Sequence, residues 1–273
     1  MVLLPLHTVP RVVHAPPLDV SVLTCWSDTQ GKRIAHSQSD GSRHWLTFDD
    51  HAVFTFTDDA SHVTGAPISA TSVKALRATY NKNALPLIMQ SRGCQVLHAS
   101  AVITSAGVVA ICGQREAGKS TFAYELGLRG REPWSDDAVV WFRESADVFA
   151  LRLPLALAPR PRTDGITHQE SRLKAPAFKD GQIHRLVAVI VLSTEQSANA
   201  KSVEKLLPNM AFRTLLQHAN AFDGRSSGQV RLFSDYVKFC ERVPIYEASI
   251  RHANLDDAVT QMDEWLECIP DLL

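Results

Sequence analysis

One eight-residue segment has the residue types and spacing of a phosphate-binding loop. It fits the pattern GxxxxGK(S/T) and reads Gly113-Gln114-Arg115-Glu116-Ala117-Gly118-Lys119-Ser120. Glycine permits backbone angles and a close approach that a Cβ atom forbids, so successive N–H groups can turn inward around phosphate oxygens. Lys119 would reach the β- and γ-phosphates, and the hydroxyl of Ser120 would ligate a magnesium ion. The segment therefore predicts nucleotide binding.

The residues on either side of this segment support the same interpretation. The apolar run Val108–Cys112 predicts a strand before it, and Thr121–Gly127 predicts a helix after it, whose positive N-terminal end would face the same anion. The alternative is an ordinary glycine-rich turn in front of a helix. The predicted cofactor-binding residues are Gly113, Gln114, Arg115, Glu116, Ala117, Gly118, Lys119, Ser120 and Thr121.

A pair of adjacent acids follows the predicted helix. Asp136 and Asp137 precede an apolar run that ends at Phe142. This order would place two carboxylates at a strand edge near the phosphates, where a Walker-B-like acid is expected. The alternative is a solvated turn.

The first part of the chain reads as a small β-rich domain, residues 1–70. The runs Val20–Leu23, Trp45–Phe48 and Val53–Phe56 carry β-branched and aromatic residues and are separated by turn residues, which indicates an antiparallel sheet. Residues 71–95 predict a helical connection, with one helix over Thr71–Asn83. A second helix would begin at Pro86 and end before Gly93. Residues 96–273 would then form the phosphate-binding domain.

The rest of the chain alternates between strand and helix patterns. The segment Arg152–Arg185 is irregular and rich in proline and basic residues, so it could be a mobile loop over the nucleotide or a solvated connection. The continuous apolar run Leu186–Leu192 predicts a strand buried on both faces. Helices are predicted over Pro208–Ala219 and Gln229–Arg242, a strand over Ile245–Ile250, and a last helix capped by Asn254 and Asp257. In the helix Gln229–Arg242 the apolar residues on one face are Val230, Phe233, Val237 and Cys240. In the last helix they are Met262, Trp265 and Leu266. Both faces should pack on the core.

Composition excludes several other classes of protein. The chain has 273 residues, 45% hydrophobic and 21% charged, with a formal net charge of −1. This balance argues against nucleic acid or an anionic membrane as partner, and no apolar run is long enough to span a bilayer. The prolines near the N-terminus do not suit a secretory signal, so a cytoplasmic location is expected. The five cysteines are Cys25, Cys94, Cys112, Cys240 and Cys268. Their spacing predicts neither a disulfide framework nor a zinc site, so we expect buried thiols.

Four features together resemble the HPr kinase family and its smaller HprK-like relatives. They are Leu97-His98-Ala99-Ser100, the glycine-containing segment, the Arg129-Gly130 end of its helix, and Ser135-Asp136-Asp137. The intervals that separate His98, Lys119 and Asp136 are also similar to those of the family. The β-rich first part followed by a helix pair is similar to the HprK-like kinases found beside peptide-modification genes, including lasso-peptide clusters.

This resemblance implies an α/β fold and a set of site residues. The fold would be a P-loop domain of the HPr kinase and phosphoenolpyruvate carboxykinase type with a mixed sheet. Asp136 would take the proton from the acceptor hydroxyl, Asp137 and Ser120 would lie on the metal side, and His98 and Lys119 would stand near the transferring phosphate. HPr kinases assemble as hexamers, so a homo-oligomer is one option for this chain.

The resulting hypothesis is an ATP- and Mg²⁺-dependent kinase that phosphorylates a hydroxyl, taken to be a serine of a peptide or small protein. Two features differ from true HPr kinases: the chain has no counterpart of their Glu-Ile-Arg-Gly signature, and Glu116 replaces a small residue of the loop. Two alternatives therefore stay open. One is a nucleotide-binding regulatory module of a peptide-maturation system that has no turnover, and the other is a small-molecule kinase.

Overall fold

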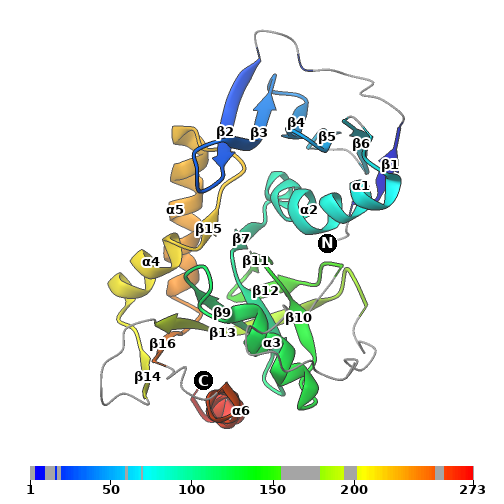
Figure 1. Ribbon diagram of the computed structural model, residues 1–273. Helices are drawn as coiled ribbons and strands as arrows, with labels where there is room; N and C mark the ends of the chain where they lie inside the picture. The colour runs from blue at the N-terminus through cyan, green and yellow to red at the C-terminus, as the bar shows by residue number, and fades with distance from the viewer. Residues whose placement is uncertain are drawn as a thin grey trace. The chain divides into compact units, whose positions relative to one another are not determined.

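The computed structural model describes residues 4–9, 16, 20–58, 61–68, 70–154, 179–193, 202–249 and 255–272. The chain divides into two compact units (Figure 1). The first comprises Met1–Val96 and Asn220–Ser234, and the second comprises Leu97–Ala219 and Asp235–Leu273. The segment Asn220–Ser234 thus belongs to the first unit, although its place in the sequence suggested the phosphate-binding domain.

The first unit contains a six-stranded sheet in the order β1-β6-β5-β4-β3-β2. Neighbouring strands from β2 to β6 are antiparallel, and β1 pairs with β6 in parallel. Aromatic and aliphatic residues on β4 and β5, such as Trp45 and Phe54, are almost fully buried. The predicted strands are confirmed as β2, β4 and β5, whereas β1, β3 and β6 had not been predicted. The strands are β1 (Leu6–Thr8), β2 (Ser21–Ser27), β3 (Arg33–Ser39), β4 (His44–Phe48), β5 (Ala52–Phe56) and β6 (Val63–Pro67).

A helical segment follows the sheet in the first unit. It consists of α1 (Val73–Thr79), the π-helix η1 (Tyr80–Ala84), α2 (Leu85–Ile88) and the 3₁₀-helix η2 (Met89–Arg92). The Ser72 hydroxyl accepts a hydrogen bond from Ala75 N and caps α1. Pro86 lies in the first turn of α2, but the helical backbone continues from η1 into α2, so the predicted start of a separate helix at Pro86 is wrong. Gly93 ends η2 at φ 88°, which confirms the predicted glycine end.

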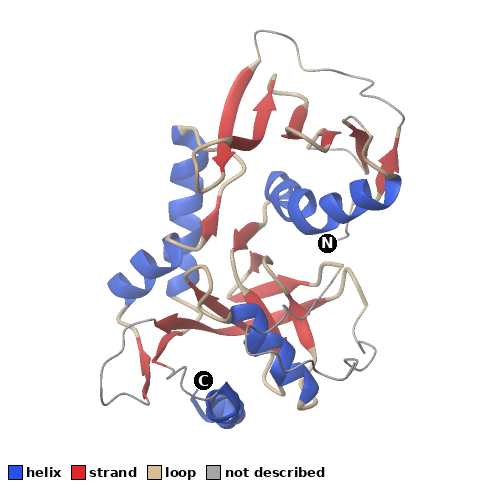
Figure 2. Cartoon of the chain, viewed as in Figure 1, coloured by secondary structure: helices blue, strands red, loops and turns tan. Residues whose placement is uncertain are grey.

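The second unit is built on a mixed sheet (Figure 2). Strand β9 lies between antiparallel β8 and parallel β13, and β13 also pairs in parallel with β16. The antiparallel strands β10, β12, β11 and β14 complete the arrangement. Their bounds are β8 (Ser100–Ile103), β9 (Val108–Gly113), β10 (Pro133–Ser135), β11 (Val139–Glu144), β12 (Asp147–Leu151), β13 (Ile183–Ser193), β14 (Ser202–Lys205) and β16 (Ile245–Ser249). Two short strands, β7 (Gln95–Leu97) and β15 (Ala219–Asn220), contain points where the chain passes between the units.

Two helices cover one face of this sheet. Side chains of α3 (Lys119–Leu128) and α6 (Leu255–Leu272) share a buried core with β9 and β13, in which Phe122 and Met262 are nearly inaccessible. The predicted strands Val108–Cys112 and Leu186–Leu192, and the helix between them, are confirmed. The core positions predicted for α6 are also found, with Leu266 fully buried and Trp265 packed against the cluster.

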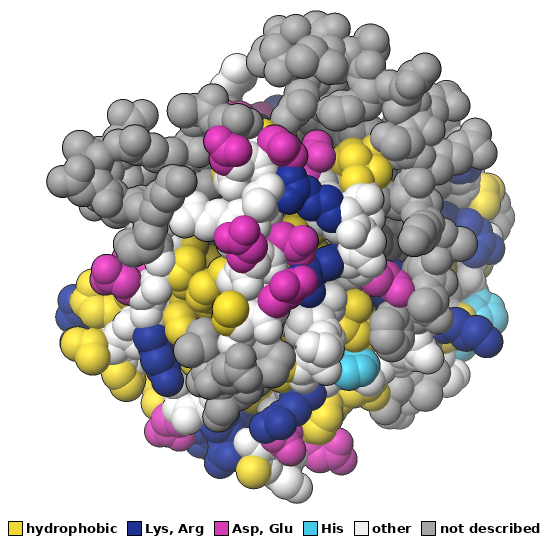
Figure 3. All heavy atoms as spheres, turned by 90° about the horizontal axis from the view of Figure 1, so that it is seen from below, with side chains coloured by type: hydrophobic (Ala, Val, Ile, Leu, Met, Phe, Trp, Pro, Cys, Tyr) yellow, Lys and Arg dark blue, Asp and Glu magenta, His cyan; other side chains and the backbone are white. Residues whose placement is uncertain are grey.

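Ion pairs fix the outer side of the α3–α6 contact. Arg129, just after α3, donates to the Thr260 hydroxyl at 2.7 Å and pairs with Asp256. Arg131 pairs with Asp263 of α6. Figure 3 shows acidic and basic side chains gathered together on one face of the molecule.

The helix α5 (Ser226–Cys240) corrects one prediction. Three residues of its expected core face, Val230, Phe233 and Val237, are 68%, 46% and 44% exposed, and the fourth, Cys240, is partly buried. The buried side chains are instead Leu232, Tyr236 and Phe239, of which the last two contact Trp141 of β11. Apolar residues occupy two sides of this helix, and the side with the large aromatic rings is buried because it removes more apolar area from water.

The five cysteines differ in their exposure to solvent. Cys94 and Cys112 are buried, and burial raises the pKa of each thiol to about 12, but Cys25 and Cys268 are exposed, so the prediction of buried thiols was only partly right. Most of the predicted irregular segment, residues 155–178, and the predicted cap Asn254 lie outside the described residues. No helix among the described residues is long and apolar enough to cross a membrane.

Candidate functional site

The loop from Gly113 to Gly118, called here the glycine loop, joins the end of β9 to the start of α3. Its backbone has positive φ at Gly113 (155°), Glu116 (68°) and Gly118 (91°). A Cβ atom at Gly113 would lie 3.1 Å from both Ala117 Cβ and Leu192 Cβ, so the strand end and the loop approach each other closely. A larger residue at Gly113 would therefore disturb the shape of the loop.

The start of α3 leaves its first-turn N–H groups without a side-chain cap. Gly118 is the N-cap residue and makes no side-chain hydrogen bond, and its carbonyl oxygen accepts the Phe122 N–H at 2.8 Å. The first N–H groups of a helix have no partner within the helix, and they attract anions together with the helix dipole. The arrangement thus suits a phosphate at the end of the glycine loop.

The Lys119 ammonium is folded back onto the glycine loop. The residue is only 7% exposed, and its Nζ donates to Gly113 O at 2.9 Å and to Gln114 O at 3.0 Å. These bonds hold a buried positive charge next to the N-terminus of α3. A phosphate oxygen could replace the carbonyl oxygens as acceptor without moving the charge far.

A cavity of about 670 Å³ opens over the glycine loop, within the second unit. Ten of its lining residues were predicted from the sequence as site residues: His98, Gly113, Gln114, Arg115, Glu116, Gly118, Lys119, Ser120, Thr121 and Asp137. The cavity also has Gln217 and His218 in its lining, which were not predicted. Two predicted residues, Ala117 and Asp136, are not among those that line it.

The two adjacent acids occupy different positions. The Asp136 carboxylate accepts hydrogen bonds from the Ser100 hydroxyl at 2.8 Å and from the Asp137 N–H at 3.1 Å. Asp137 adopts a left-handed conformation with φ 64° and lines the cavity. Asp136 thereby stabilises the turn that brings Asp137 to the cavity, because an Asp side chain can bond to the neighbouring backbone in place of a regular element.

His98 is oriented by two backbone contacts. Its ring Nδ1 lies 2.9 Å from the Asp137 carbonyl oxygen, and its backbone N–H donates to the His218 carbonyl oxygen at 2.6 Å. A carbonyl oxygen can only accept, so the Nδ1–H of the ring donates in this contact. The ring of His98 thus bonds to the turn at Asp137, and both residues line the cavity.

No protein-family model and no curated protein sequence matches this chain. Among solved structures, the HPr(Ser) kinase/phosphatase from Coxiella burnetii is similar to part of it, at 15% sequence identity and a TM-score of 0.34. The match covers 63% of this chain and 97% of that chain. A TM-score this low does not establish a shared fold, so the resemblance to HPr kinases stays a prediction from the sequence.

The buried Arg152 supports the strand that leads to the acid pair. Its side chain is 1% exposed, pairs with Glu132 at 3.2 Å, and lies over the Trp134 ring at 5.3 Å. Its Nη1 donates to Pro133 O at 3.1 Å, so the guanidinium fixes β10 immediately before Asp136. Burial lowers the pKa of Arg152, and the charge of Glu132 opposes this shift. The sequence had placed Arg152 at the edge of a loop, and the structure places it in the protein interior.

His218 lines the cavity and was not predicted as a site residue. It follows α4 (Pro208–Leu216), its N–H donates to Leu215 O at 2.9 Å, and the residue is 7% exposed. Burial, together with the nearby Lys119 and His98, lowers its pKa to about 4. The imidazole is therefore neutral near pH 7. A histidine after a helix end has many ordinary roles, so only the fold reveals this position.

The buried neutral His218 predicts a loss of stability in acid. The ordinary pKa of 6.5 applies to the unfolded chain, so between pH 6.5 and about 4 the unfolded state binds more protons and the free energy of unfolding falls as the pH falls. We expect His218→Asn to remove up to about 3 kcal/mol of this dependence. Urea unfolding between pH 7 and 4 measures it, with the exposed His51→Asn as the matched control. Equal pH dependence in His218→Asn and the unmodified protein would contradict the assignment.

The donors around the cavity suit magnesium better than a metal held by protein alone. Among the described residues, no group of three or more His, Cys, Asp and Glu side chains could hold a metal ion. Magnesium is commonly bound by one or two carboxylates together with substrate phosphates and water. The Ser120 hydroxyl lines the cavity and offers one such ligand, and the Asp137 carboxylate offers a second where it does not take the proton of an acceptor hydroxyl.

Proposed function

We propose that the second unit is an ATP-dependent kinase that transfers the γ-phosphoryl group to a hydroxyl, specifically a serine of a peptide or small protein. The observation that carries this proposal is the cavity in which the glycine loop, Lys119, Ser120 and Asp137 meet. Phosphoryl transfer depends on positioning and on neutralising charge, and these groups supply both. The sequence resemblance to HprK-like kinases favours serine as the acceptor.

Each group of the cavity has a defined part in this proposal. Bound Mg²⁺–ATP would supply the transferable phosphoryl group. Lys119 would exchange its bonds to Gly113 O and Gln114 O for phosphate oxygens, and the N-terminus of α3 would hold the same anion. The Ser120 hydroxyl would face the metal. The neutral His218 would add a hydrogen-bonding group next to Lys119 without adding positive charge.

The geometry favours Asp137 as the carboxylate that takes the proton from the acceptor hydroxyl. The resemblance had suggested Asp136, but one oxygen of Asp136 is already occupied by the Ser100 hydroxyl and the Asp137 N–H. Asp137 lines the cavity, where an acceptor could come within hydrogen-bond reach. In this scheme the acceptor oxygen bonds to phosphorus, its proton passes to Asp137, and ADP leaves. Asp136 is then a positioning residue.

One observation favours a second candidate, a nucleotide-binding module without turnover. Glu116 lines the same cavity, in a left-handed backbone conformation within the glycine loop. A carboxylate in this position opposes the negative charge of bound phosphates. This candidate predicts nucleotide binding that leads to no transfer.

Incubation with γ-labelled ATP, Mg²⁺ and peptide extracts of the native host separates the two candidates. The kinase predicts label on a peptide serine, identified by mass spectrometry as the gain of one phosphate. Tight nucleotide binding by calorimetry without label on any acceptor would favour the module without turnover. Absence of both binding and transfer would overturn nucleotide use altogether.

A further inference from the structure

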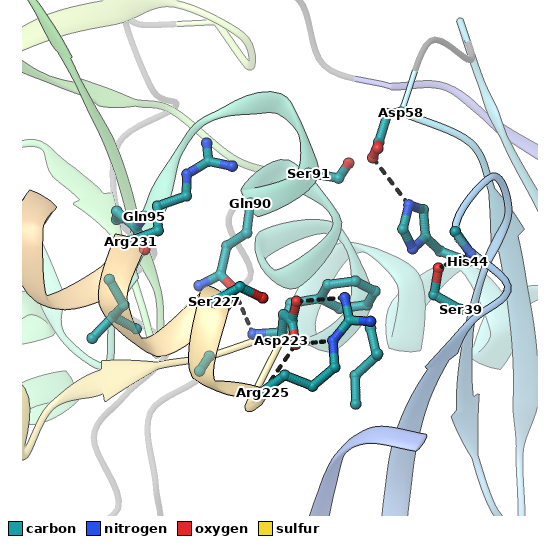
Figure 4. Close-up of a pocket in the computed structure, with 16 residues that line it drawn as sticks. Ser39, His44, Asp58, Gln90, Ser91, Gln95, Asp223, Arg225, Ser227 and Arg231 are labelled. Carbon is teal, nitrogen blue, oxygen red and sulfur yellow. Dashed lines mark hydrogen bonds and ion pairs between the residues drawn. The ribbon is translucent and has the colours of Figure 1, made fainter. Parts of the chain in front are cut away.

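A second cavity, of about 350 Å³, lies entirely within the first unit. Its walls come from the ends of β2–β4, from η2, from the loop Ala221–Arg225 and from the start of α5 (Figure 4). Cavities of this size bind small molecules or short chain segments. Nothing in the proposed phosphoryl transfer uses this cavity.

One wall of the cavity is held in place by hydrogen bonds on both sides of Phe222. The Gln90 side chain donates to Asn220 O at 2.5 Å and accepts the Phe222 N–H at 2.6 Å. The Phe222 carbonyl oxygen accepts the Ser37 hydroxyl at 2.8 Å and the Thr24 hydroxyl at 3.1 Å. With four such bonds, this loop is shaped before a ligand arrives, which lowers the entropy that binding must overcome.

The start of α5 is fitted tightly against the same loop. A Cβ atom at Gly228 would lie 2.3 Å from Asp223 O, so only glycine allows the first turn of α5 to come this close. Asp223 is itself held by two parallel bonds from Arg225, at 2.9 and 2.8 Å. The pairing with Arg225 lowers the pKa of the Asp223 carboxyl, so it stays ionised and its charge is neutralised by its partner.

The remaining charged groups of the cavity leave one cation without a carboxylate partner. His44 Nε2 lies 3.1 Å from Asp58 Oδ1, which pairs the two residues on one side of the cavity (Figure 4). Arg231 lies away from them, one turn into α5, and forms no ion pair with any of the described residues. The Ser227 hydroxyl lies on the same side of the helix, because residues i and i+4 of a helix are neighbours.

We propose that this cavity binds a small ligand through a single carboxylate, which Arg231 holds from α5. Arginine presents a planar fork of N–H donors that matches a carboxylate. A doubly charged phosphate suits the cavity less well, because Arg225 is already paired with Asp223 and Arg231 alone would face the second negative charge. The ring of Phe222, packed against His44 and Phe56, offers an apolar wall for the rest of the ligand.

Calorimetric titration of the full chain tests this assignment. The probes are free amino acids and N-acetylated dipeptides, each compared with its C-terminal amide, and inorganic phosphate. We expect saturable binding of one or more carboxylates, at least tenfold weaker binding of the matching amide, and further weakening as salt is raised. Preference for dipeptides would identify a peptide terminus as the source of the carboxylate, and preference for amino acids would identify a free metabolite.

Arg231→Gln should raise the dissociation constant of the bound carboxylate at least tenfold. Arg231 is exposed, so the variant should fold, and equal melting temperatures check this. Lys238→Gln on the same helix removes the same charge from a residue that does not line the cavity, and it should bind like the unmodified protein. Absence of binding by every carboxylate, tighter binding of phosphate, or unchanged affinity in Arg231→Gln would overturn the proposal. None of these outcomes depends on whether the second unit transfers phosphate.

Discussion

Replacing Lys119 with methionine is expected to weaken ATP binding about 10- to 100-fold, because it removes a charge-assisted hydrogen bond of about 1.5–3 kcal/mol. The rate of phosphoryl transfer at saturating ATP should also fall, by about 10²–10³-fold, since a preorganised positive charge near the phosphates is lost. Methionine keeps much of the buried stem of a side chain that is only 7% exposed. Calorimetry with ATP and an assay with labelled ATP measure the two effects separately.

The control for this change is Lys238→Met, which removes an equal charge from an exposed position of α5. The melting temperature of each variant reports whether the glycine loop still folds, because the Lys119 ammonium also bonds Gly113 O and Gln114 O. Undiminished ATP affinity in a folded Lys119→Met protein would show that the glycine loop does not bind phosphate.

Replacing Asp137 with asparagine should lower the transfer rate by about 10²–10⁴-fold, the usual contribution of a positioned general base. The affinity for nucleotide measured in the absence of Mg²⁺ should change little, because the asparagine side chain has nearly the same size as that of aspartate. Asp136→Asn should have a smaller effect of about tenfold or less, since its amide oxygen can still accept from the Ser100 hydroxyl and the Asp137 N–H. Single-turnover kinetics at saturating ATP measures both variants.

The comparison between the two asparagine variants decides which acid takes the proton. A larger loss in Asp136→Asn, with Asp137→Asn nearly active, would restore the assignment implied by the sequence resemblance. Ser100→Ala is the matched control for a purely structural effect, because it removes one hydrogen bond from Asp136 without changing either charge. Its melting temperature shows how much the turn depends on that bond.

Local sequence patterns predicted the elements that carry the glycine loop. The apolar run Val108–Cys112 and the glycine spacing are local signals, and the strand and helix on either side follow from them. The buried strand Leu186–Leu192 was also predicted correctly, because a strand that is covered on both faces needs apolar residues throughout. Gly93 also acts through local backbone geometry, so the helix end before it was predicted correctly.

The sequence could not show contacts between residues far apart in the chain. His218 reaches the cavity only because the end of α4 lies beside His98, more than a hundred positions earlier. The choice between Asp136 and Asp137 depends on the Ser100 hydroxyl of another strand. Helix α5 was assigned the wrong buried face because two of its sides are apolar, and only packing against Trp141 decides between them.

A crystal structure with Mg²⁺ and a nonhydrolysable ATP analogue would show directly whether the glycine loop binds phosphate. We expect the terminal phosphate in the glycine loop at the N-terminus of α3, with the Asp137 carboxylate facing it. Lys119 Nζ should have moved from the carbonyl oxygens of Gly113 and Gln114 onto phosphate oxygens. An analogue bound elsewhere, or a saturated crystal in which Lys119 still bonds both carbonyl oxygens, would contradict this expectation.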